Sequence, residues 1–231
     1  MDKSSFKGGG KMEILWLVLL ALICYLLGSI PFSYLVGKIY GKNLFEVGSG
    51  NIGAMNIWRA TKRLESLIMA MAGDMGKGIL AVLIACWLAF LGYSLSVGIA
   101  VAAFFVILGH NYPFTLKFKG GKGLASMAGV LVVLSWPSLL IALGVIVASI
   151  VFAEIFLKKK INLSGDSKKK FKSILSVLGS QTVGRMVGIA LALVTICFFN
   201  SDLLFLILPA GILILVKHRN IWREPEVFRK V

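Results

Sequence analysis

Long apolar runs are the feature that most constrains what this 231-residue chain can fold into. Several of them reach the ~20 residues that a helix needs to cross the hydrocarbon core of a bilayer. Hydrophobic residues make up 58% of the sequence, more than the roughly 45–50% of a soluble domain, in which glycine is also counted. A β-barrel would show ~10-residue segments of alternating polarity, whereas these runs are continuous. The sequence therefore predicts an all-α polytopic membrane protein with a single membrane domain.

We expect seven transmembrane helices in this domain. The expected ranges are 13–40, 64–91, 95–116, 124–134, 138–157, 174–199 and 203–216. Pro31 lies inside the first range and predicts a kink there. The fourth range would be only about 16 Å long, so this half-spanning helix must be shielded by protein or line a cavity. Residues 1–12 are expected to form a flexible tail, and 13–231 the domain itself.

Basic residues are concentrated in alternate connections between the expected helices. Four, three, seven and five Lys and Arg residues lie in 41–63, 117–123, 158–173 and 217–231, and none in the turns near 92, 136 and 201. By the positive-inside rule this places the N-terminus outside and the C-terminus in the cytoplasm. The same rule and anionic lipid headgroups explain the net charge of +15 better than nucleic acid does. We therefore expect membrane phospholipids, and no nucleic acid, as partners.

A polar, glycine-rich stretch, Gly48–Arg59, follows the first apolar run. Its glycines can adopt φ > 0 and let backbone N–H groups approach a ligand, and successive N–H groups in such turns make a concave anion site. Arg59 could then clamp a phosphate with two parallel hydrogen bonds. The spacing alone leaves open whether this stretch binds an anion or only connects two membrane helices.

A second polar loop, Lys117–Gly123, lies directly before the short fourth helix, whose N-terminal dipole favours an anion. The first loop, this loop, residues 158–180 and His218–Asn220 all fall on the predicted cytoplasmic side. We expect them to share one cavity, in which a cytosolic phosphorylated substrate meets a substrate dissolved in the membrane.

Several charged residues have two interpretations. Asp74 and Lys77 lie one helical turn apart, which suits either a functional site in the membrane or a structural ion pair. His110, at a helix end, is read as a structural hydrogen-bonding residue rather than a base. Arg185 could extend its charge to the interface or face the cavity. The basic run Lys168–Lys170 is interpreted as a contact with lipid headgroups.

Four motifs stand in order along the chain: GSGNIGAMNIWR (48–59), DMGKG (74–78), GHNYP (109–113) and KFKGGKG (117–123). Together they resemble the PlsY-like acyl-phosphate:glycerol-3-phosphate acyltransferase family of bacterial membranes. The resemblance is close over roughly residues 13–135 and weaker afterwards. It implies seven transmembrane helices with the N-terminus outside, in agreement with the charge distribution. It also implies a multi-pass protein of the bacterial inner (plasma) membrane with its active site on the cytoplasmic side.

The resemblance implies a specific reaction. Members transfer a fatty acyl group from acyl phosphate to the sn-1 hydroxyl of glycerol 3-phosphate, giving lysophosphatidic acid and phosphate in the first step of phospholipid synthesis. No metal and no cofactor are implied. The oligomeric state stays open, with a monomer among the options.

The resemblance also implies a set of site residues. Ser49, Arg59, Lys122 and His218 form the implied catalytic set. The implied substrate-binding residues are Gly48, Gly50, Asn51, Asn56, Lys119, Gly120, Gly121, Gly123, Ser180 and Asn220. Two departures from the family pattern affect this set. The run His218-Arg219-Asn220 is one residue shorter than usual, which turns Asn220 by about 100° if the segment is helical. The stretch from Lys158 to Lys172 is longer and more basic than the family's short connection, so Ser176 competes with Ser180 for the serine position.

The chemistry needs little from the protein beyond binding, because acyl phosphate is already activated. Arg59 and Lys122 are natural counter-charges for two anions that repel each other. His218 or the departing phosphate would accept the hydroxyl proton, and we expect direct transfer without an acyl-enzyme. The alternative class is a transporter or channel for a small anionic solute, because a half-helix at a glycine loop also occurs in transporters. The gathering of the motifs on one side and the lack of an internal hydropathy repeat argue against it.

Overall fold

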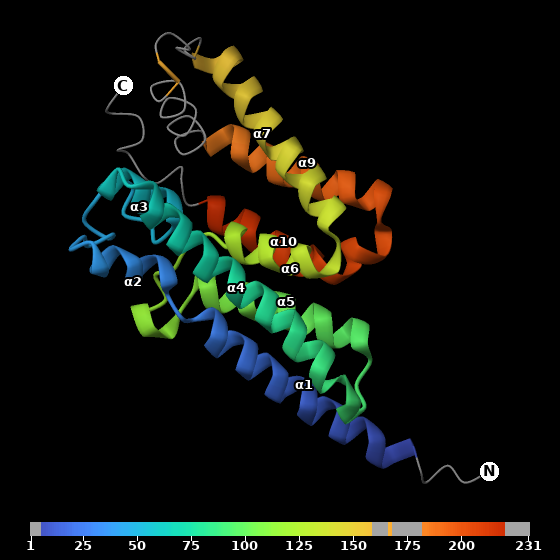
Figure 1. Cartoon of the computed structure of the whole chain (residues 1–231). Helices are drawn as coiled ribbons and strands as arrows, with labels where there is room; N and C mark the ends of the chain where they lie inside the picture. Colours follow the sequence, from blue (N-terminus) through green and yellow to red (C-terminus); the bar gives the residue numbers. More distant parts are fainter. Residues whose placement is uncertain (1–5, 159–165, 168–181, 220–231) are drawn as a thin grey trace.

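The structure is a computed structural model that describes residues 6–158, 166–167 and 182–219 (Figure 1). The elements in these ranges are helical. The long helices are α1 (Phe6–Gly28), α4 (Leu64–Leu88), α5 (Leu95–Asn111), α7 (Trp136–Lys158), α9 (Thr182–Phe199) and α10 (Ser201–Arg219). The short ones are α2 (Phe32–Ile39), α3 (Ala54–Thr61), α6 (Leu124–Leu134) and the 3₁₀ turns η1 (Ala89–Leu91) and η2 (Phe114–Leu116).

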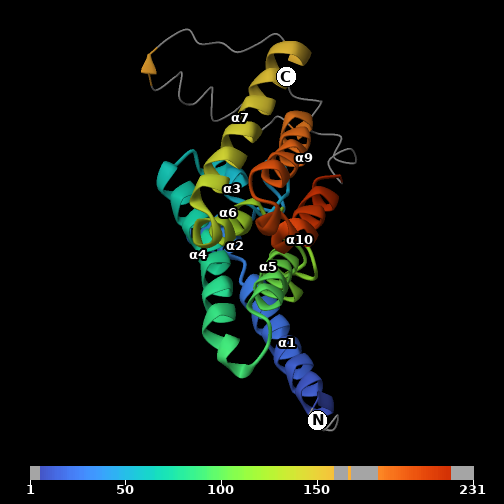
Figure 2. The same ribbon diagram turned by 90° about the vertical axis from the view of Figure 1, so that its right-hand side faces the viewer.

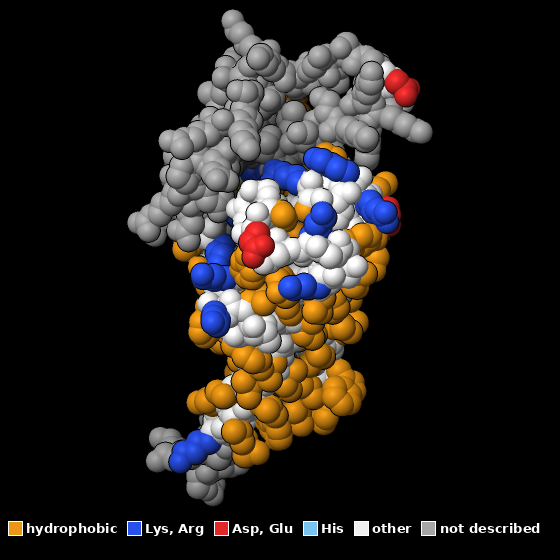
Figure 3. Space-filling model, turned by 90° about the vertical axis from the view of Figure 1, so that its left-hand side faces the viewer, with side chains coloured by type: hydrophobic (Ala, Val, Ile, Leu, Met, Phe, Trp, Pro, Cys, Tyr) orange, Lys and Arg blue, Asp and Glu red, His pale blue; other side chains and the backbone are white. Residues whose placement is uncertain are grey.

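Five segments of the described chain are long and apolar enough to cross a membrane. They are Gly10–Ile39, Leu64–Leu91, Leu95–Leu116, Trp136–Ala153 and Ser201–His218. Large apolar side chains on these helices point away from the protein interior, as lipid contact requires, and Phe205 is 79% exposed. Figure 3 shows hydrophobic side chains covering the lower part of one face, with most of the visible Lys and Arg gathered above them. The prediction of an all-α, multi-pass membrane protein is confirmed, whereas the number of crossings stays a prediction.

The first expected helix is divided in two. α1 ends at Gly28 and α2 begins at Phe32, with Pro31 between them. A proline disfavours the helical conformation in the residue before it, so the predicted kink becomes a break. At its other end α1 begins at Phe6 and takes up part of the expected flexible tail. Extending an existing helix costs far less than starting one, which accounts for this difference.

The remaining bounds differ from expectation mainly near prolines and in the first polar loop. α5 ends at Asn111, two residues before Pro113, and α6 has the predicted bounds, Leu124–Leu134. The first polar loop contains a helix that the sequence analysis did not predict, α3. α9 is described from Thr182, so the earlier part of the expected range 174–199 lies outside the described residues.

The helices pack in close pairs, of which α1 with α5, α4 with α6 and α7 with α9 are the most extensive. Figures 1 and 2 both show α7 and α9 side by side. Small residues let the backbones approach at these crossings, as is usual between membrane helices. A side chain on Gly28 would overlap the backbone of Val106, and one on Gly129 the backbone of Met75. Buried apolar side chains of these helices form one continuous core.

The polar segments gather at one end of this bundle. In Figure 1 the left end holds α2, α3, η2, the start of α9 and the end of α10. The turns after α4 and after α9 lie at the opposite end. The break between α1 and α2 is joined to the end of α5, because Thr115 Oγ1 donates to Ser29 O (2.9 Å) and Tyr25 Oη to Tyr112 O (3.0 Å). The fold thus brings the ends of several helices together beside the two glycine-rich loops.

Candidate active site

The first glycine-rich loop is shaped by Asn56 of α3, whose side chain lies beneath it and is almost fully buried. Asn56 Oδ1 accepts from the backbone N–H of Ser49 at 3.0 Å, and Nδ2 donates to Leu44 O at 3.1 Å and Val47 O at 2.9 Å. Gly48 has a φ of +60°, and a side chain there would overlap Asn56 Oδ1. The side chain of Asn56 therefore holds the loop by hydrogen bonds to backbone groups of residues 44–49. A direct contact of Asn56 with substrate stays a prediction.

The second glycine-rich loop folds back onto the end of α5. The N–H of Gly121 donates to His110 O (3.0 Å) and that of Gly120 to Asn111 O (3.2 Å). A side chain on Gly121 would overlap His110 Nε2 and lie 2.6 Å from Ile52 O. Only glycine fits at this point, where the two loops and the end of α5 meet. The structure thereby brings the first and second loops close together at this point, and a substrate cavity shared by all the polar segments stays a prediction.

Lys122 stands at the start of α6. Gly123, with a φ of +85°, is the residue that precedes the helix, and α6 begins at Leu124. The first N–H groups of a helix are not paired within it, and together with the helix dipole they favour an anion. The Lys122 side chain and the N-terminus of α6 therefore supply positive potential to the same region.

Three cationic side chains and one histidine from separate elements come together near this point. Arg185 of α9 is close enough to Arg59 of α3 for their charges to interact. His218 of α10 lies within electrostatic range of both Arg185 and Lys122. Cationic side chains that lie near one another attract an anion such as a phosphate. Arg185 thus lies within electrostatic range of the predicted site residues Arg59 and His218, and the roles of these residues in binding or catalysis stay predictions.

The imidazole of His218 is oriented by its own helix. Its side chain is fully buried, and Nδ1 lies 2.9 Å from Ile214 O. A carbonyl oxygen only accepts, so Nδ1 carries the proton in the neutral ring and Nε2 is left as an acceptor. Nε2 is also buried and has no hydrogen-bond partner among the described residues. The residue is therefore able to accept a proton at Nε2.

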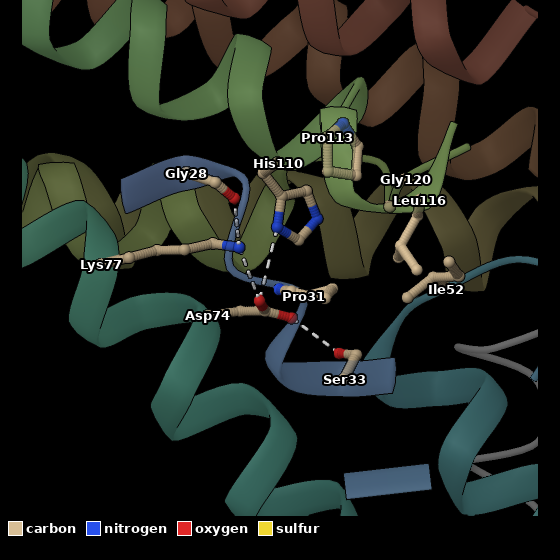
Figure 4. Close-up of a pocket in the computed structure, with 11 residues that line it drawn as sticks. Gly28, Pro31, Ser33, Ile52, Asp74, Lys77, His110, Pro113, Leu116 and Gly120 are labelled. Atoms are coloured by element: carbon tan, nitrogen blue, oxygen red, sulfur yellow. Dashed lines mark hydrogen bonds and ion pairs between the residues drawn. The ribbon is translucent and has the colours of Figure 1, made fainter. Parts of the chain in front are cut away.

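A second group of polar residues lies between α4, the break after α1 and the end of α5 (Figure 4). Asp74 Oδ1 is 2.9 Å from Lys77 Nζ and 3.4 Å from His110 Nδ1, and Asp74 Oδ2 accepts from Ser33 Oγ at 2.7 Å. Lys77 Nζ also donates to Gly28 O and to Ile30 O, both at 3.0 Å. The side chains of Ser33, Asp74, Lys77 and His110 line a small pocket together with Ile52, Gly120 and Gly121. Asp74 and Lys77 form the ion pair that the sequence analysis left open.

The other predicted residues fall into two groups. Gly50 and Asn51 are partly exposed in the first loop, and Lys119 is exposed in the second. Ser180, its rival Ser176 and Asn220 lie outside the described residues, so their roles stay predictions. Within the described ranges, no group of three or more His, Cys, Asp or Glu side chains is placed to hold a metal ion.

Sequence reasoning did not assign a role to Arg185 or to the Asp74–His110 contact. The available signal was the presence of ionisable residues within apolar runs, which makes such residues functional candidates. Their partners could not be read from the sequence, because they lie on helices far apart in the chain.

The known proteins that this chain resembles are glycerol-3-phosphate acyltransferases. The family model described as glycerol-3-phosphate acyltransferase matches residues 18–164. A glycerol-3-phosphate acyltransferase of a Wolbachia species from Brugia malayi is 37% identical over 201 residues, covering 87% of this chain and 90% of the relative. One from Carboxydothermus hydrogenoformans is 47% identical over 120 residues, a match that spans 52% of this chain and 58% of the relative.

Two similar solved structures are crystal structures of PlsY, an integral membrane glycerol 3-phosphate acyltransferase. The glycerol 3-phosphate form has a TM-score of 0.67 and 26% sequence identity, and the match covers 93% of this chain and 94% of that chain. The lysophosphatidic acid form has a TM-score of 0.64 and 27% identity with the same coverage. The similarity therefore extends over nearly the whole bundle and both loops.

Proposed function

Because the chain belongs to the glycerol-3-phosphate acyltransferase family, we propose that it transfers a fatty acyl group from acyl phosphate to the sn-1 hydroxyl of glycerol 3-phosphate. The products would be lysophosphatidic acid and inorganic phosphate. Family membership confirms the prediction of an acyltransferase and removes the need for the transporter alternative. The acyl-phosphate donor, the position acylated and the roles of individual residues are the proposed parts.

The observation that carries this proposal is the cationic cluster of Arg59, Lys122 and Arg185 beside His218. Both substrates are anions, and the reaction must bring them within bonding distance despite their repulsion. Cations that converge from separate elements at the N-terminus of a helix suit phosphate groups. Holding two reactants in the productive geometry can be worth up to about 7–11 kcal/mol, so binding supplies most of the catalysis that an activated donor needs.

The proposed step is a direct displacement at the acyl carbon. The hydroxyl oxygen of glycerol 3-phosphate bonds to the carbonyl carbon, and the bond from that carbon to the phosphate oxygen breaks. Phosphate leaves with the electron pair of that bond. The hydroxyl proton goes to His218 Nε2, which is the buried acceptor described above, with the departing phosphate as the alternative acceptor. Ser49 then orients substrate and forms no covalent intermediate.

We further propose that the protein crosses the bacterial inner membrane seven times with its N-terminus outside. In this arrangement the end of the bundle that holds both loops faces the cytoplasm. Glycerol 3-phosphate would reach the cationic cluster from the cytosol, and the acyl chain would enter from the lipid. The basic connections at this end support the proposal through the positive-inside rule.

The experiment that tests the proposal is phosphate release from acyl phosphate by the purified protein, with and without glycerol 3-phosphate. We expect release to require glycerol 3-phosphate. Lys122→Ala should lower kcat/KM about 10- to 100-fold, because loss of a hydrogen bond to a charged group costs about 1.5–3 kcal/mol. Lys42→Ala, which removes an exposed lysine of the first polar loop, is the matched control and should change activity less than twofold. Release that is independent of glycerol 3-phosphate would contradict acyl transfer.

A further inference from the structure

The buried charges between α4 and the end of α5 are connected by a network of ion pairs and hydrogen bonds. The side chains of Asp74 and Lys77 are only 2% and 1% exposed. Lys77 Nζ donates hydrogen bonds to Gly28 O and Ile30 O and forms an ion pair with Asp74 Oδ1 at 2.9 Å. Lys77 thereby connects Asp74 of α4 to the carbonyl groups at the break after α1.

Stability alone is a poor explanation for such a network. Removing two charges from water costs about as much as their attraction returns, and apolar replacements of buried ion pairs are often neutral or stabilising. The break after α1 could be packed with apolar side chains at less cost. The feature that apolar side chains would not reproduce is the direction of the Asp74 carboxylate, because Lys77 holds Oδ1, the oxygen that also faces His110.

The direction matters because Asp74 Oδ1 also faces the His110 ring. Nδ1 of this ring is 3.4 Å from Asp74 Oδ1, and Nε2 abuts Gly121 so closely that no side chain fits there. Figure 4 shows the ring standing between the carboxylate and the loop segment at Gly120. A rotation of the ring away from Asp74 would therefore displace Gly121 and the residue that follows it, Lys122.

We propose that Asp74 and His110 are positioning residues: their contact sets the place of the glycine–lysine loop and so the affinity for glycerol 3-phosphate. The inference rests on the proposed function, in which Lys122 binds phosphate. Asp74 and His110 act through the loop and do not touch the substrate. The remaining part of the network, Lys77 with the carbonyl groups of Gly28 and Ile30, keeps the carboxylate in register with the ring.

The test compares three variants of the full chain with the unaltered protein. Asp74→Asn keeps the size of the side chain and removes its charge. His110→Phe keeps a ring and removes both nitrogen atoms. Each should raise KM for glycerol 3-phosphate about tenfold while kcat changes less than threefold. The double variant should resemble either single variant, because both changes remove the same contact.

Ser33→Ala is the matched control. It removes the hydrogen bond to the other carboxylate oxygen, Oδ2, and leaves the side that faces His110 in place. We expect it to lower the thermal midpoint with little change in KM, which separates positioning from a general loosening of the network. A Ser33→Ala KM raised as much as that of Asp74→Asn would overturn the proposal, as would multiplying effects in the double variant.

Hydrogen exchange provides a readout that is independent of turnover. The amides of Gly120 and Gly121, which bond to the end of α5, should exchange faster in Asp74→Asn and His110→Phe, while amides of α7 keep their rate. Unchanged exchange at the loop, together with an unchanged KM, contradicts the positioning role. Should the unaltered protein fail to turn over acyl phosphate, the proposed function fails and loop exchange alone decides the positioning role.

Discussion

At the residue scale, Arg185 is the side chain whose placement adds most to the sequence analysis. It lies near the start of α9, a helix that is otherwise strongly apolar. Its charge is close to that of Arg59 and to His218. Ionisable residues within membrane helices usually face the interior of the bundle and mark candidate functional sites. An anion such as phosphate bound near Arg185 and Arg59 would be attracted by both guanidinium groups.

Arg185→Met should therefore raise KM for glycerol 3-phosphate about tenfold, with a smaller effect on kcat. The matched control is Arg63→Met, because Arg63 is an exposed arginine whose side chain is 62% accessible and is 3.8 Å from Glu65. Steady-state kinetics with varied glycerol 3-phosphate give the answer. An Arg185→Met protein with unaltered KM would exclude this residue from the phosphate site.

At the element scale, glycines determine how closely the helices cross. α4 and α6 pack tightly because residues without side chains lie at the crossing, among them Gly129, whose neighbour is the backbone of Met75. This crossing positions the short helix α6 and therefore the residues at its N-terminus, which begin at Gly123. The packing of α6 against α4 thus helps to fix the position of Lys122, which precedes α6.

Gly129→Ala should destabilise the protein by about 1–3 kcal/mol, because an added methyl group overpacks this crossing. Gly144 of α7 gives the matched control, since no atom lies within 4 Å of a side chain added there. Gly144→Ala should be neutral or stabilise by up to about 1 kcal/mol, since alanine favours a helix more than glycine does. The thermal midpoint of each variant in detergent micelles measures the difference. Equal midpoints for the two variants would contradict the close α4–α6 crossing.

The sequence predicted elements well where a long apolar run is bounded by polar or glycine residues, as for α4 and α6. It predicted less well near Pro31, where the composition indicates a kink or a break without distinguishing them. It also missed α3, because the eight residues of this helix are only weakly apolar and depend on tertiary contacts with α4.

At the scale of the whole molecule, the basic connections in the described chain gather at the end of the bundle that holds both glycine-rich loops (Figure 1). Charge counting along the sequence predicts that Arg59, Lys122 and His218 share one side of the membrane. It could not predict that Arg185 joins them, or that His110 abuts Gly121, because these contacts depend on the crossing of distant helices. The spacing of residues along the sequence does not show which distant helices cross.

The proposed orientation can be tested by cysteine labelling of intact bacterial cells. The native Cys24, Cys86 and Cys197 are first replaced, and single cysteines are then introduced as Ser94→Cys and Lys42→Cys, both at exposed positions. A membrane-impermeant maleimide should label Ser94→Cys from outside, and Lys42→Cys only after the cells are permeabilised. The reverse pattern would place the candidate active site outside the cell.

The most direct test of the central claim is to identify the product by mass spectrometry. The purified protein, reconstituted in liposomes, is supplied with glycerol 3-phosphate and either an acyl phosphate or an acyl thioester of the same chain length. We predict lysophosphatidic acid from the acyl phosphate, in a one-to-one ratio with released phosphate, and none from the thioester. The account would be contradicted if lysophosphatidic acid formed from the thioester alone. It would also be contradicted if folded protein formed no lysophosphatidic acid from either donor.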